Sequence, residues 1–584
     1  MTARWLVPGF LALALLGVTA TAEAAPSVEL AAILADYDRY STLVDPVSAG
    51  QRGDLAALAR WPDDSPAAIR ERQRTLTALS RRLAALPPTL TEEERLNVEL
   101  LADRIDLDLE GFTFDEERIP FNTGEGFFVM PDFAAEGTAL RSEEQALAWI
   151  RKLEALPAYF DTQVANMRRG LATHFVRPRL VAATVAATLK RRAAAAPEAS
   201  MLLEPLAALP ATLPAAMRTA LNARALEVVR TRIKPAEAAL ATFIATEYLP
   251  KASDAIGIGN LKDGQRYYAY LIRRHASTRM SAERIHALGL EEIARINAQI
   301  GDAIAAAGFH GTRAEFLEFL RTAPEFKPSS VADYLEKTRD VAKRADALLP
   351  QFFGTLPRLT YGVRLVSPAL KGSSSGYDPG SPEQGVSGSV VVNVDADSLA
   401  QATLFGMPAW FLHEGVPGHH LQIALAQERT DLPAFRRNSD INAFVEGWAL
   451  YSEHLGVEMK MYRTPYENFG RLSLEMWRAC RLVIDTGMHV MGWTRDQAVA
   501  CLRENSALSE RSINYEVDRY IGWPAQALGY KIGEIRIRAM RARAEASLGT
   551  RFDLRAFHDA VLVGGPMPLD ILDKRIDAWI ASRR

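Results

Sequence analysis

The chain has 584 residues, of which 48% are hydrophobic and 24% are charged. This balance is ordinary for a globular protein and excludes a chain that is disordered throughout. The formal net charge is −3, so we expect neither a basic nucleic-acid-binding surface nor a single-sign interaction tail. The length allows several domains, although a large helical fold can form one body.

Residues 1–24 have the pattern of a secretory signal peptide. Arg4 precedes an apolar run over residues 5–18, and Ala22-Glu23-Ala24 places small residues before a cleavage site. The run is shorter than the ~20 residues that a membrane span requires. No cysteine near the cleavage site offers a lipid attachment point. The pattern predicts export to the periplasm or beyond, with no stable membrane anchor after cleavage.

Helical periodicity dominates the chain from residue 28 to about residue 349. Apolar residues recur at three- and four-residue spacing, and polar caps such as Thr91 and Ser281 precede the expected helix starts. We expect residues 25–350 to form much of one lobe of a single fold. Residues 351–584 are expected to carry the catalytic region.

The pattern changes to short β-rich stretches between residues 357 and 395. Residues 359–366 and 389–394 are predicted strands, separated by a polar Gly/Ser loop over residues 371–388. They predict a small two-stranded sheet or hairpin. It could offer an edge to which an extended peptide adds, or it could be a structural ribbon that closes a helical lobe.

The stretch His413-Glu414-Gly415-Val416-Pro417-Gly418-His419-His420 contains three of the ten histidines. Neutral imidazole is the commonest protein ligand for zinc. A glutamate beside a ligating histidine can act as the general base for zinc-bound water. The stretch therefore predicts a hydrolytic metal site with His413 as a ligand and Glu414 as the base.

The spacing of these histidines does not fit one straight helix. His420 would return to the face of His413 but ~10 Å further along the axis, at ~1.5 Å per residue. Pro417 removes a helical hydrogen-bond donor, so residues 415–418 are predicted to form a break that brings a later histidine back. Both His419 and His420 remain candidates for the second ligand. The preceding segment, residues 398–414, is predicted to be a helix that kinks or restarts at Pro408.

A third ligand is expected on the next predicted helix, around residues 442–453. Glu446 stands among apolar residues, where a carboxylate is costly to bury unless a positive group meets it. Glu453 lies two turns later on a similar face. It is either an alternative ligand or a group that orients a ligating histidine by a hydrogen bond.

Four segments together resemble a bacterial domain-of-unknown-function family, number 885: HEGVPGHH (413–420), FVEGWALYSE (444–453), RLVIDTGMH (481–489) and YIGWPAQALGYKIG (520–533). That family is in turn remotely similar to helical gluzincin zinc peptidases, such as thimet oligopeptidase and the Taq-type carboxypeptidases. The resemblance implies a mostly α, large helical clamshell with a deep central groove, zinc as cofactor, and peptide hydrolysis. It makes His413, His419 and Glu446 the ligands and Glu414 the base. The interval from His413 to His419 is two residues longer than in those peptidases.

Peptide hydrolysis also requires a donor to the developing oxyanion. Residues 522–524 are predicted to begin a helix on which Gln526 and Tyr530 share a face. Tyr530 and, just outside that helix, Tyr520 are the candidate donors, and both could instead be packing residues.

A polar stripe at helical spacing includes Arg481 and His489 together with Arg478 and Asp485. It is either a solvated helix face or a groove wall that offers guanidinium to a peptide carboxylate. Arg519 and Lys531 are further candidates for contact with substrate.

These features predict an exported zinc metallopeptidase acting on short or extended peptides. An amidase or esterase with a non-peptide substrate would use the same chemistry. A peptide-binding protein of the same fold without turnover is a further alternative. A two-histidine, one-carboxylate iron oxygenase ranks last, because Glu414 has no role there.

Overall fold

The computed structural model describes residues 27–366, 375–399 and 401–584. The predicted signal peptide and part of the Gly/Ser loop lie outside these ranges. Across them, no helix is both long enough and apolar enough to span a membrane. The described chain is mostly α-helical with one small sheet, which confirms the prediction of a mostly α fold that includes a small sheet.

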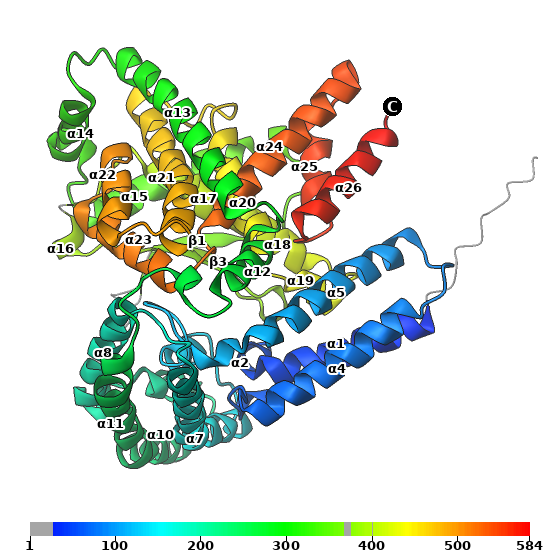
Figure 1. The fold of residues 1–584 in the computed structure, drawn as a ribbon, viewed down its shortest axis with the longest axis vertical. Helices are drawn as coiled ribbons and strands as arrows, with labels where there is room; N and C mark the ends of the chain where they lie inside the picture. Colours follow the sequence, from blue (N-terminus) through cyan, green and yellow to red (C-terminus); the bar gives the residue numbers. More distant parts are fainter. Residues whose placement is uncertain (1–26, 367–374, 400) are drawn as a thin grey trace, which may run out of the picture.

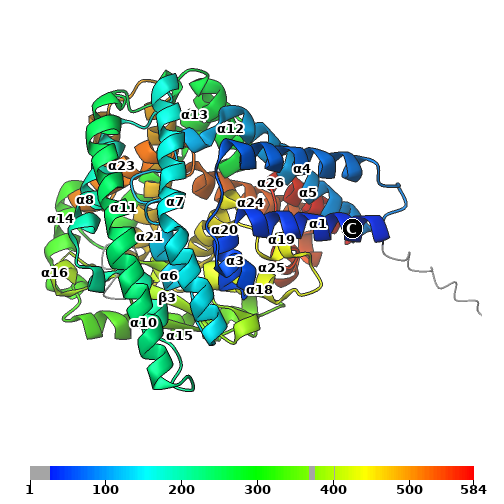
Figure 2. The same cartoon turned by 90° about the horizontal axis from the view of Figure 1, so that it is seen from below.

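The N-terminal helices form the lower part of the molecule in Figure 1, and Figure 2 shows the long helices α7, α10 and α11 from below. The helices of this part are α1 (Val28–Val44), α2 (Pro46–Gln51), α3 (Leu55–Leu58), α4 (Pro66–Ala84), α5 (Glu92–Gly111), α6 (Met130–Glu136), α7 (Glu143–Thr173), α8 (Arg179–Ala194), α9 (Glu204–Ala207), α10 (Ala215–Val228) and α11 (Lys234–Phe243). The predicted caps are present: Thr91 and Glu94 form a capping box at the start of α5.

The remaining helices form the upper part of Figure 1. They are α12 (Gly264–Ala276), α13 (Ala282–Ala306), α14 (Arg313–Thr322), α15 (Val331–Phe352), α16 (Ala396–Leu399), α17 (Met407–Glu414), α18 (His419–Glu428), α19 (Ala434–Arg437), α20 (Asn442–Leu455), α21 (Pro465–His489), α22 (Arg495–Asn505), α23 (Glu510–Gly522), α24 (Leu528–Leu548), α25 (Leu554–Leu562) and α26 (Leu569–Ala581).

Helices α12 to α15 begin before residue 350 but lie with the C-terminal helices. The contact between α13 and α21 shows how closely they pack. A Cβ atom built on Gly289 of α13 would lie 2.7 Å from Cγ2 of Val483 in α21. Because α21 carries the predicted polar stripe, this packing fixes one wall of the candidate site.

The sheet has three strands, in the order β1-β3-β2. Strand β1 (Tyr361–Leu365) runs parallel to β3 (Gly388–Val392), and β2 (Gly376–Asp378) runs antiparallel to β3. The predicted two-stranded hairpin is therefore wrong in strand number and in direction. Three residues within a Gly/Ser-rich loop give too short an alternation to identify β2 from sequence.

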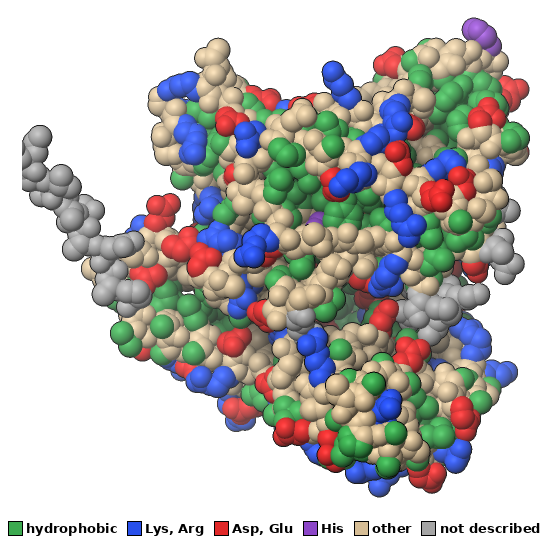
Figure 3. Space-filling model, turned by 180° about the vertical axis from the view of Figure 1, so that it is seen from behind, with side chains coloured by type: hydrophobic (Ala, Val, Ile, Leu, Met, Phe, Trp, Pro, Cys, Tyr) green, Lys and Arg blue, Asp and Glu red, His purple; other side chains and the backbone are tan. Residues whose placement is uncertain are grey.

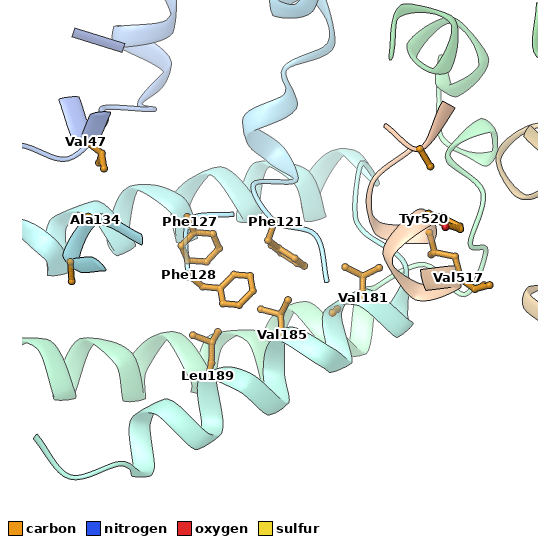
Figure 4. Close-up of a cluster of buried hydrophobic side chains, with 14 of the residues drawn as sticks. Val47, Phe121, Phe127, Phe128, Ala134, Val181, Val185, Leu189, Val517 and Tyr520 are labelled. Carbon is orange, nitrogen blue, oxygen red and sulfur yellow. The ribbon is translucent and has the colours of Figure 1, made fainter. Parts of the chain in front are cut away.

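Buried apolar side chains join the two parts of the molecule. One large cluster extends from Val47 and Phe121 in the N-terminal part to Val517 and Tyr520 of α23. Figure 4 shows Phe121, Phe127 and Phe128 beside the α8 side chains of Val181, Val185 and Leu189, with Val517 and Tyr520 of α23 at one side of the same cluster. This shared core holds the N-terminal loop at residues 119–128 against the helix that precedes the candidate site.

Charged side chains of both signs are interspersed over the face seen in Figure 3, as the near-neutral composition predicts. Cys480 is buried in α21, and Cys501 is partly buried in α22. Both are free cysteines, and the Cys480 thiol lies 4.0 Å from the carbonyl oxygen of Cys501. The pair therefore packs as small apolar residues in this structure.

Candidate metal centre

The helix break predicted within the histidine stretch is present. Helix α17 ends at Glu414 and α18 begins at His419, with a cis peptide bond between Val416 and Pro417. Helix α17 itself begins at Met407 with Pro408 in its first turn, so the predicted restart is also found. A Cβ atom on Gly418 would lie 2.0 Å from the carbonyl oxygen of His413, so only glycine fits this turn.

The break brings His413, His419 and Glu446 together. One ligand atom from each lies within 4.8 Å of the other two. The Nε2 atom of His413 lies 3.3 Å from Oε2 of Glu446, and that of His419 lies 3.5 Å from the same oxygen. Two imidazoles and a carboxylate that leave room for water are a donor set typical of catalytic zinc.

One ligand atom of this trio is not satisfied by the protein. Within the described chain, Oε2 of Glu446, the oxygen that faces both Nε2 atoms, is buried and has no hydrogen-bond partner. Burial alone would raise the pKa of Glu446, but the nearby His413 and His419 hold it well below its usual range. Burial alone would lower the pKa of His413, yet Glu446 and Glu453 raise it to about 9. The site thus favours positive charge at its centre, and a divalent cation fits its donors.

His420 points away from this trio. Its Nδ1 lies 2.9 Å from the Tyr377 hydroxyl of β2, and its Nε2 lies 3.1 Å from the carbonyl oxygen of Leu359. Both ring nitrogens are therefore engaged within the protein. The structure brings His419, and not His420, to the carboxylate of Glu446.

Glu453 contacts His413 from behind. Its Oε1 atom lies 2.9 Å from His413 Nδ1, opposite the Nε2 atom that faces Glu446. A guanidinium nitrogen of Arg478 lies 3.5 Å from the same carboxylate oxygen. Glu453 therefore lies where a carboxylate can fix the orientation and tautomer of His413, the position required by the second of the two roles predicted for it.

Glu414 is the last residue of α17 and adjoins the trio. Its carboxylate approaches β2, because a Cβ atom built on Gly376 would lie 3.9 Å from Glu414 Oε2. Burial raises the pKa of Glu414, and the nearby histidines oppose this effect. A carboxyl group held between a metal site and a strand can exchange a proton with a bound molecule.

Tyr530 lies on the opposite side of His413. The two rings are nearly parallel, with their centroids 6.2 Å apart. Burial raises the pKa of Tyr530 to about 12, so its phenol stays protonated at neutral pH and can donate. The predicted helix start at residue 522 is wrong: α23 ends at Gly522 and α24 begins at Leu528. Gln526 lies in the turn between them.

Tyr520 lies inside α23 and is fully buried. Its hydroxyl donates to Glu516 at 2.6 Å and accepts from Arg481 at 2.8 Å and from Trp477 Nε1 at 2.9 Å. All three partners belong to the protein. Tyr530 is therefore the better placed of the two candidate donors.

Arg481 is enclosed between aromatic rings. Its guanidinium carbon lies 4.3 Å from the ring centroid of Trp477 and 4.2 Å from that of Tyr530. A terminal guanidinium nitrogen of Arg481 lies 3.2 Å from Oε2 of Glu516. The side chain is 2% exposed, so it supports the Tyr530 ring by a cation–π contact and does not reach an open surface.

The other predicted substrate-binding residues take separate positions. His489 Nδ1 accepts a hydrogen bond from the backbone amide of Ile258, and its Nε2 contacts the carbonyl oxygen of Tyr520. Both ring nitrogens therefore bind backbone groups within the protein. Lys531 is fully buried in an ion cluster with Glu292, Glu475 and Glu534, away from the trio.

Arg519 remains partly exposed. One of its terminal nitrogens donates to Gln526 at 2.8 Å, and the other lies 3.0 Å from Glu516. Arg519 and Gln526 thus form one hydrogen-bonded unit beside the turn that precedes Tyr530.

Three features of the site were not predicted from sequence. Trp477 stacks on Arg478 as well as on Arg481, β2 adjoins Glu414, and Trp448 Nε1 donates to the carbonyl oxygen of Pro417 at 2.8 Å. The last contact ties the helix break to α20, which carries Glu446. Its signal in the sequence is weak, because one tryptophan on an apolar helix does not identify a distant carbonyl partner.

Comparisons with known proteins agree with this fold. A crystal structure from Colwellia psychrerythraea, of a protein named as a candidate lipoprotein, has a TM-score of 0.89 at 26% identity, covering 95% of this chain and 99% of that one. A candidate lipoprotein of unknown function from Shewanella oneidensis has a TM-score of 0.71 at 18% identity, covering 94% of this chain and 99% of that one. No curated protein matches the chain. The model of the family described as bacterial protein of unknown function (DUF885) matches residues 46–576, and the chain belongs to that family.

Proposed function

We propose that this protein is a zinc-dependent peptidase. The observation that carries the proposal is the convergence of His413 Nε2 and His419 Nε2 on one carboxylate oxygen of Glu446, with Glu414 beside them. The buried Glu446 Oε2, which has no hydrogen-bond partner in the described chain although both Nε2 atoms face it, supports a bound cation. The absence of cysteine from the trio favours a catalytic over a structural zinc site.

His413, His419 and Glu446 would hold a zinc ion, which would supply a Lewis acid and lower the pKa of a water molecule. Glu414 takes the proton of the attacking water at a carboxylate oxygen and returns it to the leaving amine, as a general base and then a general acid. Tyr530 donates its phenolic proton in a hydrogen bond to the oxyanion that forms at the attacked carbonyl. Glu453 keeps the proton of His413 on Nδ1, so that Nε2 presents its lone pair.

We further propose that the mature protein works outside the cytoplasm. The predicted signal peptide supports export, and the two structural neighbours are both named as candidate lipoproteins. Export to the periplasm or beyond is the proposed outcome.

The test combines metal analysis with a digest of mixed peptides. We expect about one zinc per chain, cleavage that a chelator abolishes, and loss of cleavage in Glu414→Gln with zinc retained. Glu428→Gln is a matched control. Glu428 is the last residue of α18, and its carboxylate accepts hydrogen bonds from the backbone amides of residues 358 and 359 rather than contacting the trio. Unchanged activity in Glu414→Gln would refute the mechanism.

Two other outcomes select the alternatives. Zinc-dependent cleavage of amide or ester substrates, with no peptide cleaved, would assign the same chemistry to a non-peptide substrate. Retained zinc with binding but no cleavage of any peptide would make the protein a peptide-binding member of the fold.

A further inference from the structure

A hollow of about 1010 Å³ lies where the two parts of the molecule face each other beside the sheet. The N-terminal part contributes residues of α2 and α6, including Phe133 and Glu136. The C-terminal part contributes Asp378 of β2 and the loop that follows, including Val386. We call this hollow the β2 groove.

Strand β2 links the β2 groove to the candidate metal centre. Asp378 lines the groove, and a Cβ atom built on Gly376, two residues earlier in the same strand, would lie 3.9 Å from Glu414 Oε2. Between them, Tyr377 contacts His420, which follows the ligand position His419. A chain that lies along β2 would therefore run from the groove toward the proposed general base.

The lining of the β2 groove combines apolar and polar groups. Phe133 is 50% exposed and Val386 is 47% exposed, and both are among the few large hydrophobic side chains that the described chain leaves open to solvent. Phe133 belongs to α6 in the N-terminal part, and Val386 belongs to the loop after β2. Exposed apolar residues around a concave site that also offers polar groups are typical of ligand recognition.

The charges of the lining argue against a phosphate-rich ligand. It contains four carboxylates (Asp45, Glu136, Asp378 and Glu383) and three guanidinium groups (Arg52, Arg364 and Arg437). Arg364 pairs with Asp378, and Arg437 lies 3.3 Å from Glu383. No basic surplus remains for a polyanion. Paired charges, serine hydroxyls and a strand suit a peptide, which brings its own backbone donors and acceptors.

We propose that the β2 groove binds the chain of an extended oligopeptide on one side of the bond that is cut, with an apolar side chain seated between Phe133 and Val386. The inference rests on the proposed peptidase function and specifies its substrate class. A volume of about 1010 Å³ equals the upper end of the ~300–1,000 Å³ that encloses a whole drug-sized ligand. The groove therefore accommodates several residues, and dipeptides leave most of it empty.

The test measures binding apart from cleavage. The probes are a fluorescein-labelled hexapeptide of alternating leucine and serine and a labelled Leu-Ser dipeptide, added to zinc-loaded full-length Glu414→Gln. Phe133→Ser and Val386→Ser are made in that background. Leu43→Ser is the matched control, because Leu43 is 59% exposed and lies in α1, outside the β2 groove.

We expect each groove substitution to weaken hexapeptide binding by roughly 5- to 10-fold, the loss for partial burial of one apolar side chain. Leu43→Ser should bind the hexapeptide like the parent, and dipeptide binding should be equal in all variants. In the enzyme with Glu414 intact, the same substitutions should raise KM for the hexapeptide and leave kcat unchanged.

The results separate the two proposals. Equal hexapeptide binding in the parent, Phe133→Ser and Val386→Ser would overturn the groove proposal, whether or not peptides are cleaved. Failure of the parent to bind the hexapeptide would overturn it as well. Weakened binding in both groove variants, with no cleavage of any peptide by the zinc-loaded enzyme, would support the groove and refute the peptidase function.

Discussion

Gly447 of α20 and Gly533 of α24 touch backbone to backbone: a Cβ atom built on Gly447 would lie 2.5 Å from the Cα atom of Gly533. This contact sets the distance between the two helices that carry Glu446 and Tyr530. The third metal-ligand candidate and the candidate oxyanion donor therefore lie around the same histidine, His413. Two glycines at a helix crossing allow this approach, since any side chain there would push the helices apart.

Gly447→Ala is expected to separate α20 from α24. Overpacking of a tight contact costs roughly 1–3 kcal/mol, and the shift also moves Glu446. We expect a lower free energy of unfolding and lower zinc content. Gly301→Ala is the control, because no atom lies within 4 Å of the Cβ position of Gly301 in α13, so this change should stabilise the helix slightly. Denaturant unfolding of both variants and the parent checks the prediction. A free energy of unfolding for Gly447→Ala equal to that of the parent would contradict it.

His419→Ala and His420→Ala should differ in zinc content. His419 offers a ring nitrogen to the trio, whereas both nitrogens of His420 are bonded to Tyr377 and Leu359. We expect His419→Ala to lose zinc and His420→Ala to keep it, with a stability cost of roughly 1–3 kcal/mol from polar groups left unpaired. Metal analysis of the two purified variants measures the difference. Zinc loss in His420→Ala alone would reverse the ligand assignment.

Glu453→Gln should weaken zinc binding without removing a ligand. The change takes away the charge that holds the Nδ1 proton of His413. Loss of such a supporting group typically lowers metal affinity by roughly 10- to 100-fold. Glu458→Gln is a suitable control, because Glu458 follows the end of α20 and pairs with Arg541, not with His413. Competition with a zinc-binding dye gives both affinities, and identical values would show that Glu453 does not support the ligand.

Acid should destabilise the protein through His558. Burial lowers the pKa of His558 to about 4, and its ring nitrogens contact the Tyr451 hydroxyl and the carbonyl oxygen of Phe352. An unfolded histidine titrates near pH ~6.5, so between these values the unfolded chain binds more protons and stability falls as pH falls. From about pH 7 to about pH 5 the loss from this residue is roughly 1–2 kcal/mol.

His558→Gln removes this titration. We expect its unfolding free energy at neutral pH to be lower than that of the parent, but to decline less steeply toward acid. Urea unfolding at several pH values compares the two slopes. Parallel pH dependence in both proteins would show that His558 does not contribute.

Much of the site was predictable because its signals are local. Pro417 and Gly418 interrupt a helical pattern, so the break at residues 415–418 follows from backbone chemistry alone. The apolar setting of Glu446 marked it as a carboxylate that needs a positive partner. The helical fold class followed from periodicity over several hundred residues, which is the strongest pattern a single sequence carries.

The short strand β2 and the turn that holds Gln526 were not predictable in this way. Three residues of β2 are held by pairing with β3, and the turn between α23 and α24 includes Ala525 at φ +67°. Neither feature is required by the local residues, because both depend on partners distant in the chain. The same holds for Arg481, whose spacing fits a solvated stripe although Trp477 and Tyr530 enclose it.

The sequence by itself determined that this chain is a helical protein with a histidine-rich break and a nearby buried carboxylate. Only the tertiary structure decided which histidine faces that carboxylate, what Glu453 does, and where Lys531 and His489 lie. The reason is geometric. Convergence of side chains on a point depends on how helix axes cross, and here those crossings are set by contacts such as Gly447 with Gly533, between residues far apart in the chain.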